Sequence, residues 1–204
     1  MIKTIIFDLG GVLIDWDPKH LYRKIFDTEQ EVDFFLTHIA TSDWNETQDG
    51  GRSLKDGTDL LLKQFPEDKW KEPITAFYDR WTEMLGGPVL GTVEILKQCI
   101  DNPTLQVYAL TNWSGETWPI ALQEFEFLHW FEGVLVSGQE GMRKPVREFY
   151  QLMMDRFNIE KESAVFIDDN QRNVDASNAF GLRALLFENP IKLVKDLKRL
   201  GVLK

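Results

Sequence analysis

Short apolar segments and longer amphipathic segments alternate along most of the chain. The apolar segments are hydrophobic at nearly every position, which is typical of strands buried on both faces of a parallel sheet. We predict strands at residues 4–7, 105–110, 133–136, 164–167 and 183–187. The amphipathic segments predict helices at residues 89–100, 116–127, 146–157 and 173–180, the last ended by Gly181. This order predicts an α/β fold, a Rossmann-like parallel sheet with helices on both faces.

The alternation stops between residues 17 and 85, where the pattern is helical. Helix-like stretches occupy residues 18–26, 29–40, 53–65 and 68–84, and no segment there has a convincing strand pattern. Residues 41–51 are polar and end in glycine, so we predict a loop between the second and third of these helices. We therefore expect a helical cap, residues 17–85, inserted after the first strand of a core domain formed by residues 1–16 and 86–204.

Composition narrows the choice of partners. The 204 residues carry a formal net charge of −10, which argues against nucleic acid or an anionic membrane as the main partner but leaves a small phosphate ligand possible. No stretch approaches the roughly 18 apolar residues of a membrane span, and the amino terminus lacks the layout of a signal peptide. The single cysteine, Cys99, cannot form an intramolecular disulfide and lies in an apolar stretch, as a buried structural thiol would. We expect a cytoplasmic protein, a monomer or weak homodimer.

Polar residues follow several of the predicted strands, at the edge of the sheet where ligands of such folds bind. Asp8 ends the first strand and is followed by Gly10 and Gly11, which permit close approach of a ligand. A strand-end aspartate also caps helices or forms turns, so Asp8 alone does not decide between these roles. Thr111 and Asn112 follow the second strand, and their hydroxyl and amide groups can hold phosphate oxygens or form a turn.

Asp168 and Asp169 are the strongest indication of chemistry. Two adjacent carboxylates at the end of an apolar strand destabilise the fold unless a cation neutralises them, and a helix cap accounts for only one. A divalent metal with oxygen ligands meets this requirement, and Mg²⁺ suits a site shared with phosphate. Lys144, in the segment GMRKP, would by itself be interpreted as a solvated surface lysine.

The segments IIFDLGGVL, LTNW, GMRKP and FIDDNQRN contain these residues in chain order, and their conjunction is far more specific than any one of them. Together they resemble the four signature motifs of the haloacid dehalogenase-like hydrolase superfamily. Within it, they most resemble the branch that contains sugar-1-phosphate phosphatases and the amino-terminal phosphatase domain of soluble epoxide hydrolases. The resemblance covers essentially the whole chain, including a helical cap inserted after the first motif.

This resemblance implies a phosphatase that acts on a small phosphorylated metabolite. Asp8 would attack phosphorus and form an aspartyl-phosphate, which water then hydrolyses. Thr111 and Asn112 would hold phosphoryl oxygens. Lys144 would offset the charge of Asp8 and the substrate.

The resemblance also implies a set of metal ligands. Mg²⁺ would bind the Asp8 carboxylate, the backbone carbonyl of Gly10 and the Asp169 carboxylate, with Asp168 acting directly or through water. Phosphoryl transfer depends mostly on positioning and on charge neutralisation, which a metal and a lysine provide.

Position 10 departs from the pattern of the superfamily. Most of its phosphatases carry a second aspartate two residues after the nucleophile, as general acid and base, whereas this chain has Gly10. General acid–base catalysis is typically worth about 10² to 10⁴-fold. Three consequences stay open: the enzyme favours good leaving groups such as sugar 1-phosphates, another group such as Asp15, Asp17 or His20 substitutes, or the chain binds without catalysis.

Substrate specificity should come from the cap, because the core motifs contact only the phosphate. We expect the leaving group to contact residues of the cap boundary, the loop at 41–51 and the segment after the second strand, and the candidates are Trp16, Asp17, Trp44, Asn45, Thr47 and Trp113. Helical spacing predicts instead that Trp70 and Trp81 belong to the core of the cap.

Two other functions compete with the phosphatase. A 2-haloacid dehalogenase of the superfamily also lacks the second aspartate, but it needs no metal, so the Asp168 and Asp169 pair argues against it. A non-catalytic phosphometabolite-binding protein has no evident use for Asp8 as a nucleophile. The sequence favours a magnesium-dependent phosphatase over both.

Overall fold

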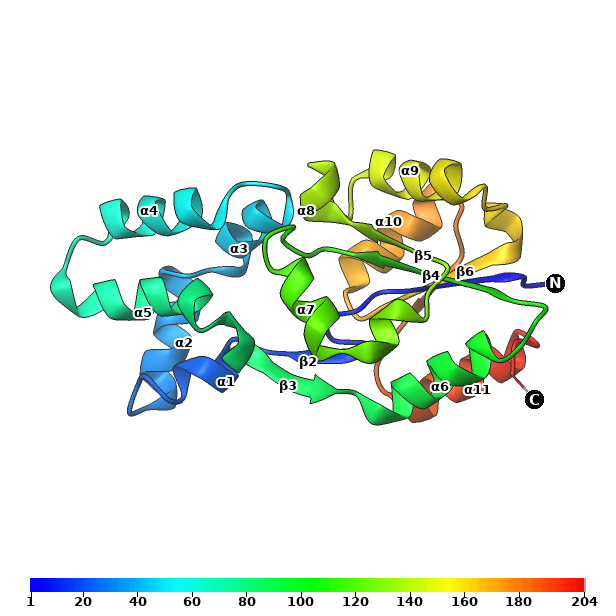
Figure 1. The fold of residues 1–204 in the computed structure, drawn as a ribbon, viewed down its shortest axis with the longest axis horizontal. Helices are drawn as coiled ribbons and strands as arrows, with labels where there is room; N and C mark the ends of the chain where they lie inside the picture. Colours follow the sequence, from blue (N-terminus) through cyan, green and yellow to red (C-terminus); the bar gives the residue numbers. More distant parts are fainter. Residues whose placement is uncertain (204) are drawn as a thin grey trace.

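In the computed structural model, which describes residues 1–203, a five-stranded parallel sheet lies at the centre of one half of the molecule (Figure 1). Its strands follow the spatial order β5 (Gly133–Val136), β4 (Gln106–Thr111), β1 (Thr4–Phe7), β6 (Ala164–Asp168) and β7 (Ala184–Leu186). All five correspond to predicted strands, and every neighbouring pair is parallel. Their carboxyl ends therefore meet at one edge of the sheet.

Helices cover both faces of this sheet. The helical segments of the core are α6 (Leu90–Ile100), α7 (Trp118–Glu124), η2 (Glu126–His129), α8 (Ser137–Glu140), α9 (Arg147–Phe157), η3 (Lys161–Ser163), α10 (Gln171–Phe180) and α11 (Pro190–Arg199). Ile5 and Phe7 of β1 join a hydrophobic cluster with α6, α7 and α11, whereas Ile6 joins a second cluster with α9 and α10 (Figure 1). This division follows from the two-residue period of a strand and confirms the predicted α/β class.

A helical region forms the other half of the molecule, on the left of Figure 1. It contains α1 (Lys19–Tyr22), α2 (Glu29–His38), α3 (Ser42–Asp49), α4 (Leu54–Gln64), α5 (Asp68–Asp79) and the 3₁₀ turn η1 (Trp81–Met84). Its own core is rich in aromatic side chains, with Tyr22 packed at 4.6 Å from Phe35 and 6.2 Å from Phe77 between ring centroids. We refer to this region as the cap.

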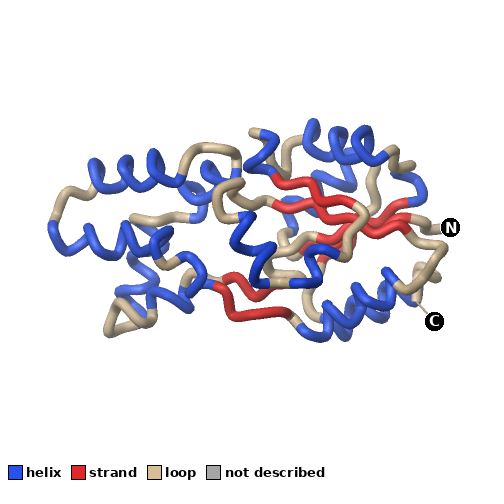
Figure 2. Tube along the Cα trace, in the orientation of Figure 1, coloured by secondary structure: helices blue, strands red, loops and turns tan. Residues whose placement is uncertain are grey.

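Two short antiparallel strands connect the cap to the sheet. β2 (Ile14–Trp16) leads into the cap, β3 (Leu85–Pro88) leads out of it, and Trp16 pairs with Leu85 (Figure 2). The sequence did not predict this pair, because strands of three and four residues carry no clear periodicity and β3 contains two glycines.

Helix α3 replaces the loop that we predicted at residues 41–51, and the prediction was wrong. The helix begins after Thr41, whose Oγ1 accepts a hydrogen bond of 3.2 Å from the backbone N–H of Trp44. Its sequence, SDWNETQD, is almost entirely polar and therefore lacks the apolar stripe of an ordinary surface helix.

Two further predictions from the sequence concern a membrane span and the single cysteine. No helix within residues 1–203 combines the length and apolar character required to cross a membrane. Cys99 is buried in the core, where burial raises the pKa of its thiol to about 12, as expected for a structural cysteine.

Candidate active site

A cavity of about 330 Å³ lies between the carboxyl ends of the core strands and the cap. The core contributes Asp8, Lys144 and Asp169 to its lining, and the cap contributes a face of α3 and aromatic side chains. The volume is within the range of about 300 to 1,000 Å³ that small-molecule sites occupy.

Asp8 lies directly after β1 and is held firmly in place. Its backbone N–H donates to the carbonyl of Ile167 at 2.8 Å, and its Oδ1 accepts from the backbone N–H of Leu9 at 2.7 Å. The other oxygen, Oδ2, is 2.9 Å from Nζ of Lys144. Burial raises the pKa of Asp8 well above its ordinary value, and the Lys144 ammonium offsets only part of this shift.

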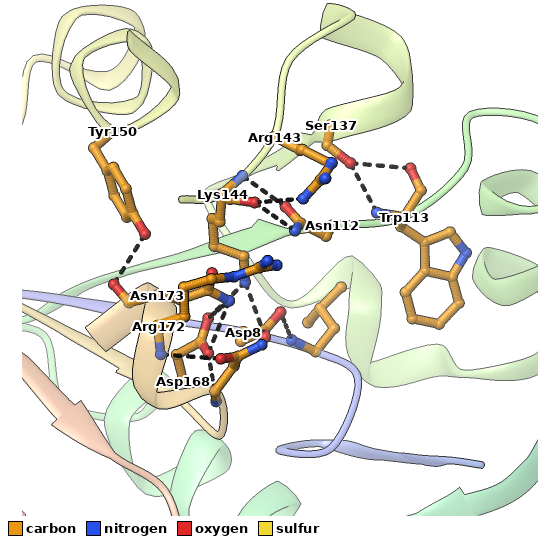
Figure 3. Close-up of polar contacts among 12 residues, drawn as sticks. Asp8, Asn112, Trp113, Ser137, Arg143, Lys144, Tyr150, Asp168, Arg172 and Asn173 are labelled. Atoms are coloured by element: carbon orange, nitrogen blue, oxygen red, sulfur yellow. Dashed lines mark hydrogen bonds and ion pairs between the residues drawn. The ribbon is translucent and has the colours of Figure 1, made fainter. Parts of the chain in front are cut away.

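Lys144 is completely buried, contrary to the usual surface position of a lysine. Its Nζ contacts Oδ2 of Asp168 at 2.7 Å as well as Asp8 (Figure 3). Burial alone would lower the pKa of Lys144, but the two carboxylates outweigh it and raise the pKa above its ordinary value. The ammonium therefore stays charged between the two aspartates.

Asn112 positions this lysine. Its side-chain oxygen accepts from the backbone N–H of Lys144 at 2.8 Å, and its Nδ2 donates to the carbonyl of Lys144 at 3.0 Å (Figure 3). The amide that we predicted to hold phosphoryl oxygens is thus largely used in fixing Lys144. Thr111, at the end of β4, is fully buried and, contrary to our prediction, does not line the cavity; its Oγ1 has no hydrogen-bond partner within residues 1–203.

Asp168 and Asp169 occupy different environments at the end of β6. Asp168 is fully buried and accepts hydrogen bonds from Nδ2 of Asn173 at 3.1 Å and from the backbone N–H of Asn170 at 2.8 Å (Figure 3). Asp169 is an exposed residue that lines the cavity, and partial burial of its carboxyl group, followed by the nearby charge of Asp168, raises its pKa.

The predicted meeting of the first and fourth motifs is present in the structure. Oxygen atoms of Asp8, Asp168 and Asp169 all lie within 4.8 Å of one another. A Cβ atom at Gly11, where φ is +74°, would lie 2.2 Å from Oδ2 of Asp169, so only glycine lets the first loop pass this close.

This group of side chains fits a divalent cation. With the carboxylates ionised, three aspartates and one lysine leave two negative charges unneutralised in a largely buried site. All the available donors are oxygens, the ligand type that Mg²⁺ and Ca²⁺ prefer. The side-chain oxygen of Asn173 is buried beside them without a hydrogen-bond partner in residues 1–203, so it can accept one more hydrogen bond.

Aromatic side chains form another part of the cavity wall. Trp16 and Trp113 line it as predicted, and they are joined by Tyr78 and Trp81. Trp81 packs edge to face against Trp113, with ring centroids 5.5 Å apart. We predicted Trp81 as a core residue; it is buried, but it also faces the cavity. Nε1 of Trp113 is buried and has no hydrogen-bond partner within residues 1–203.

Trp44 is not part of this wall, contrary to our prediction. It is 7% exposed, its Nε1 donates to the carbonyl of Gly57 at 2.9 Å, and its ring packs edge to face against Phe77. Because the segment is helical, Trp44 faces the interior of the cap while its neighbour Asn45 faces the cavity.

The three groups that we considered as replacements for the missing acid also lie off the cavity wall. Nε2 of His20 contacts Oδ2 of Asp15 at 3.0 Å, beside Gly86. Oδ1 of Asp17 accepts from the backbone N–H of Lys19 at 2.8 Å, as a turn-forming aspartate does.

One face of α3 lines the cavity, and only Asn45 of it was predicted from the sequence. The residues of that face share the spacing i, i+3, i+4 and i+7 and all line the cavity, and they are Ser42, Asn45, Glu46 and Asp49. Glu46 also pairs with two arginines of the core, at 2.7 Å to Arg143 and 2.6 Å to Arg172. The spacing is visible in the sequence, but only once the segment is known to be helical.

Comparisons with known proteins agree with this architecture. The chain is 28% identical over 202 residues to the sesquiterpene phosphatase astK of Aspergillus oryzae, and the match covers 97% of this chain and 96% of that protein. It is 25% identical to the drimenol cyclase drtB of Aspergillus calidoustus over 97% of this chain, which spans only 36% of that longer protein.

A solved structure shares the fold. It is the enzyme bt-2542 of Bacteroides thetaiotaomicron in complex with magnesium and inorganic phosphate, at 22% identity and a TM-score of 0.66, covering 93% of this chain and 96% of that one. The family model for haloacid dehalogenase-like hydrolases matches residues 2–181. The chain therefore belongs to the haloacid dehalogenase-like hydrolase family.

Proposed function

We propose that this protein is a magnesium-dependent phosphatase that hydrolyses a small phosphorylated metabolite through an aspartyl-phosphate on Asp8. The observation that carries the proposal is the convergence of Asp8, Asp168 and Asp169 around the buried Lys144. A nucleophilic carboxylate, an ammonium and a cation-binding group at one point of a cavity are the parts that phosphoryl transfer requires. The phosphatase relative astK supports the same reaction class.

The carboxylates of Asp8 and Asp169 and the carbonyl of Gly10 would hold Mg²⁺, and Asp168 would act on it directly or through water. When bound, the ion supplies positive charge that screens the phosphoryl group from the carboxylates. Asp168 has a second task in this arrangement, because its contact with Nζ fixes the position of Lys144.

The remaining roles fall to groups of the chain itself. Asp8 attacks phosphorus in line with the leaving group, and Lys144 neutralises charge on Asp8 and on the phosphoryl oxygens. Trp113 lines the cavity and its Nε1 has no hydrogen-bond partner within residues 1–203, which supports a role in holding the leaving group or the phosphate. A buried donor that gains a partner when substrate binds favours binding. Thr111 is not among the residues that line the cavity, so its unpartnered hydroxyl does not support the predicted contact with a phosphoryl oxygen.

For the leaving group, we propose a sugar phosphate such as a sugar 1-phosphate. The anomeric oxygen is a good leaving group, and the aromatic wall of Trp16, Trp81 and Trp113 suits the apolar face of a sugar ring. The same wall also suits an apolar chain, and the sesquiterpene relative makes isoprenyl phosphates the natural comparison. A panel containing sugar 1-phosphates, sugar 6-phosphates and an isoprenyl monophosphate separates these classes by kcat/KM.

The test of the reaction is release of inorganic phosphate from p-nitrophenyl phosphate, with and without Mg²⁺, by wild type and Asp8→Asn. We expect turnover only with the metal, and loss of about 10⁴ to 10⁶-fold in Asp8→Asn, as for removal of other catalytic nucleophiles. Equal rates in wild type and Asp8→Asn would contradict the proposal. Metal-independent release of halide from a 2-haloacid would instead establish the dehalogenase, and phosphate-ester binding without turnover would establish a binding protein.

A further inference from the structure

Within residues 1–203, the carboxyl groups on the core side of the cavity, Asp8 and Asp169, already have the proposed roles of nucleophile and metal ligand. Position 10 is glycine, and a Cβ atom built there would meet no other atom of residues 1–203 within 4 Å. Asp15, Asp17 and His20 do not line the cavity. Lys144 remains charged between Asp8 and Asp168 and serves them both.

Asp49 is a carboxyl group on the cap side of the same cavity. It is the last residue of α3 and lies on the helix face that lines the cavity. Asp8 lines the same cavity from the core side. Neither of the roles proposed above, metal binding or nucleophilic attack, uses it.

The contacts of Asp49 hold it across the junction between cap and core. Nδ2 of Asn45, one helical turn earlier, donates to Oδ2 of Asp49 at 3.1 Å. The hydroxyl of Ser137, which follows β5 directly as the first residue of α8, donates to the backbone carbonyl of Asp49. The first of these bonds lies within α3, and the second ties the end of α3 to the strand ends of the core.

The surroundings of Asp49 favour its neutral form. Burial is the largest cause, and together with the nearby charge of Glu46 it raises the pKa of Asp49 to about 7. Arg143, the backbone N–H of Ser114 and Lys144 act in the opposite direction and limit the rise. The position at the carboxyl end of a helix also disfavours a negative charge. A carboxyl group that is half protonated near neutral pH can both donate and accept a proton.

We propose, on the basis of the phosphatase function above, that Asp49 of the cap is the general acid and base of this enzyme and replaces the aspartate absent at position 10. In the first step Asp8 Oδ forms a bond to phosphorus, the bond from phosphorus to the leaving oxygen breaks, and the Asp49 carboxyl gives its proton to that oxygen. In the second step a water oxygen bonds to phosphorus, its proton passes to the Asp49 carboxylate, and the Asp8–phosphorus bond breaks. Asp8 is free again and Asp49 is protonated again, so the cycle closes.

The assignment changes the expected range of substrates. Without an acid, the rate should fall steeply as the leaving group becomes more basic. With Asp49 as the acid, alkyl phosphates such as sugar 6-phosphates become substrates as well as sugar 1-phosphates.

The experiment compares wild type with Asp49→Asn, which keeps the shape and loses the proton, on a series from p-nitrophenyl phosphate to simple alkyl phosphates. The readout is kcat/KM, because it covers all steps up to formation of the phosphoenzyme. We expect Asp49→Asn to lower kcat/KM by about 10² to 10⁴-fold for alkyl phosphates and far less for p-nitrophenyl phosphate. An equal loss across the series, or no loss, overturns the inference.

The second half-reaction gives an independent readout. With p-nitrophenyl phosphate, Asp49→Asn should accumulate acid-stable phosphoenzyme on Asp8, because no base activates the water. Equal steady-state phosphoenzyme in wild type and Asp49→Asn contradicts a role in hydrolysis. Wild-type kcat/KM for an alkyl phosphate should fall as pH rises above about 7, where Asp49 loses its proton, and this decline should be absent in Asp49→Asn.

Two variants complete the design. Asp43→Asn makes the same chemical change on an exposed residue of α3 and should behave as wild type. In Asp49→Asn, the further change Gly10→Asp places a carboxyl group in the open space at position 10 and should restore alkyl phosphate turnover in part. If wild type shows no Asp8-dependent phosphate release at all, the proposed function fails. If that release is intact and the leaving-group series is parallel in both proteins, only the role of Asp49 fails.

Discussion

The core side and the cap side of the cavity differ in how they place their charged groups. The core side places charges at the ends of buried strands, where Asp8, Lys144 and Asp168 lie in direct contact and have little access to solvent. The cap side presents one polar face of α3, with Asn45 and Asp49 one turn apart. On the core side Asp8 and Asp168 keep the Lys144 ammonium charged, and Lys144 in turn offsets part of the burial that raises the pKa of Asp8. On the cap side burial and the charge of Glu46 raise the pKa of Asp49 and disfavour its charged form. The first side is therefore suited to binding ions, and the second to exchanging a proton.

Removing a charge from the core side should be strongly destabilising. Lys144→Met leaves Asp8 and Asp168 buried without their cation, and breaking such a pair costs about 3 to 5 kcal/mol. Urea unfolding in the absence of divalent metal measures the loss. Lys195→Met, an exposed lysine on α11, is the matched control and should change stability little. A Lys144→Met protein as stable as the control would mean that the core cluster is not a stabilising network.

Removing the charge of Asp49 from the cap side should instead increase the stability of the folded protein. The folded protein raises the pKa of Asp49 to about 7, whereas an unfolded aspartate has a pKa of about 3.9. The folded form thus binds the proton more tightly, so this contribution to stability is complete below about pH 4 and is lost as pH rises to about 7. The difference of about three pH units sets an upper limit of about 4 kcal/mol.

Asp49→Asn should therefore be more stable than wild type at pH 8 and show little gain at pH 4. The free energy of unfolding in urea at the two pH values measures this, with Asp43→Asn as the control. A variant that loses stability at pH 8 would show that the Asp49 carboxylate is stabilised by the cap–core junction, against the comparison drawn above.

Metal binding should depend on the core side alone. A cation that binds only the folded protein at 100 times its Kd raises the free energy of unfolding by about 2.7 kcal/mol. We expect Mg²⁺ to raise the Tm of wild type and of Asp49→Asn equally, and to raise that of Asp169→Asn much less. A smaller Mg²⁺ effect in Asp49→Asn would place the cap acid among the metal ligands.

The smallest expected effect, on KM, distinguishes Trp113, which lines the cavity, from Trp44, which is buried in the cap. Trp113→Phe removes the unpartnered Nε1 donor of a residue that lines the cavity, so KM should rise by about 2- to 10-fold, the worth of one hydrogen bond, with stability unchanged. Trp44→Phe removes a donor already bonded to Gly57 inside the cap, so stability should fall and KM should stay constant. If Trp44→Phe changed KM instead, our original assignment of Trp44 to the substrate would return.

The same contrast explains what the sequence predicts well. A buried strand must be apolar along its whole length, so a pair such as Asp168 and Asp169 at its end is conspicuous and has few structural explanations. The strands, the carboxylate cluster and the meeting of Asp8 with Asp169 could all be predicted for that reason. Lys144 could be assigned only through its motif, since nothing local distinguishes it from a surface lysine.

Helix α3 shows why the rest could not be predicted. A helix with one face on a polar cavity and only Trp44 and Gln48 buried in the cap has no apolar stripe to reveal it. Interpreted as a loop, the segment gives no reason to group Asn45 with Asp49, and it leaves Trp44 free to point anywhere. The pKa of Asp49 is likewise invisible in the sequence, because it depends on burial by residues far away along the chain.

The paired strands β2 and β3 have a consequence for how such an enzyme can diversify. Because Trp16 and Leu85 lie side by side, the chain leaves the core domain and returns to it at one place. A different insertion with ends at the same spacing could be grafted there without disturbing the strand order of the five-stranded sheet. Such a graft would bring a new binding surface for the organic part of a substrate. It would also remove α3, and with it Asp49. If Asp49 is the general acid and base, a replacement insertion must provide another ionisable side chain, or the enzyme will hydrolyse only esters with good leaving groups.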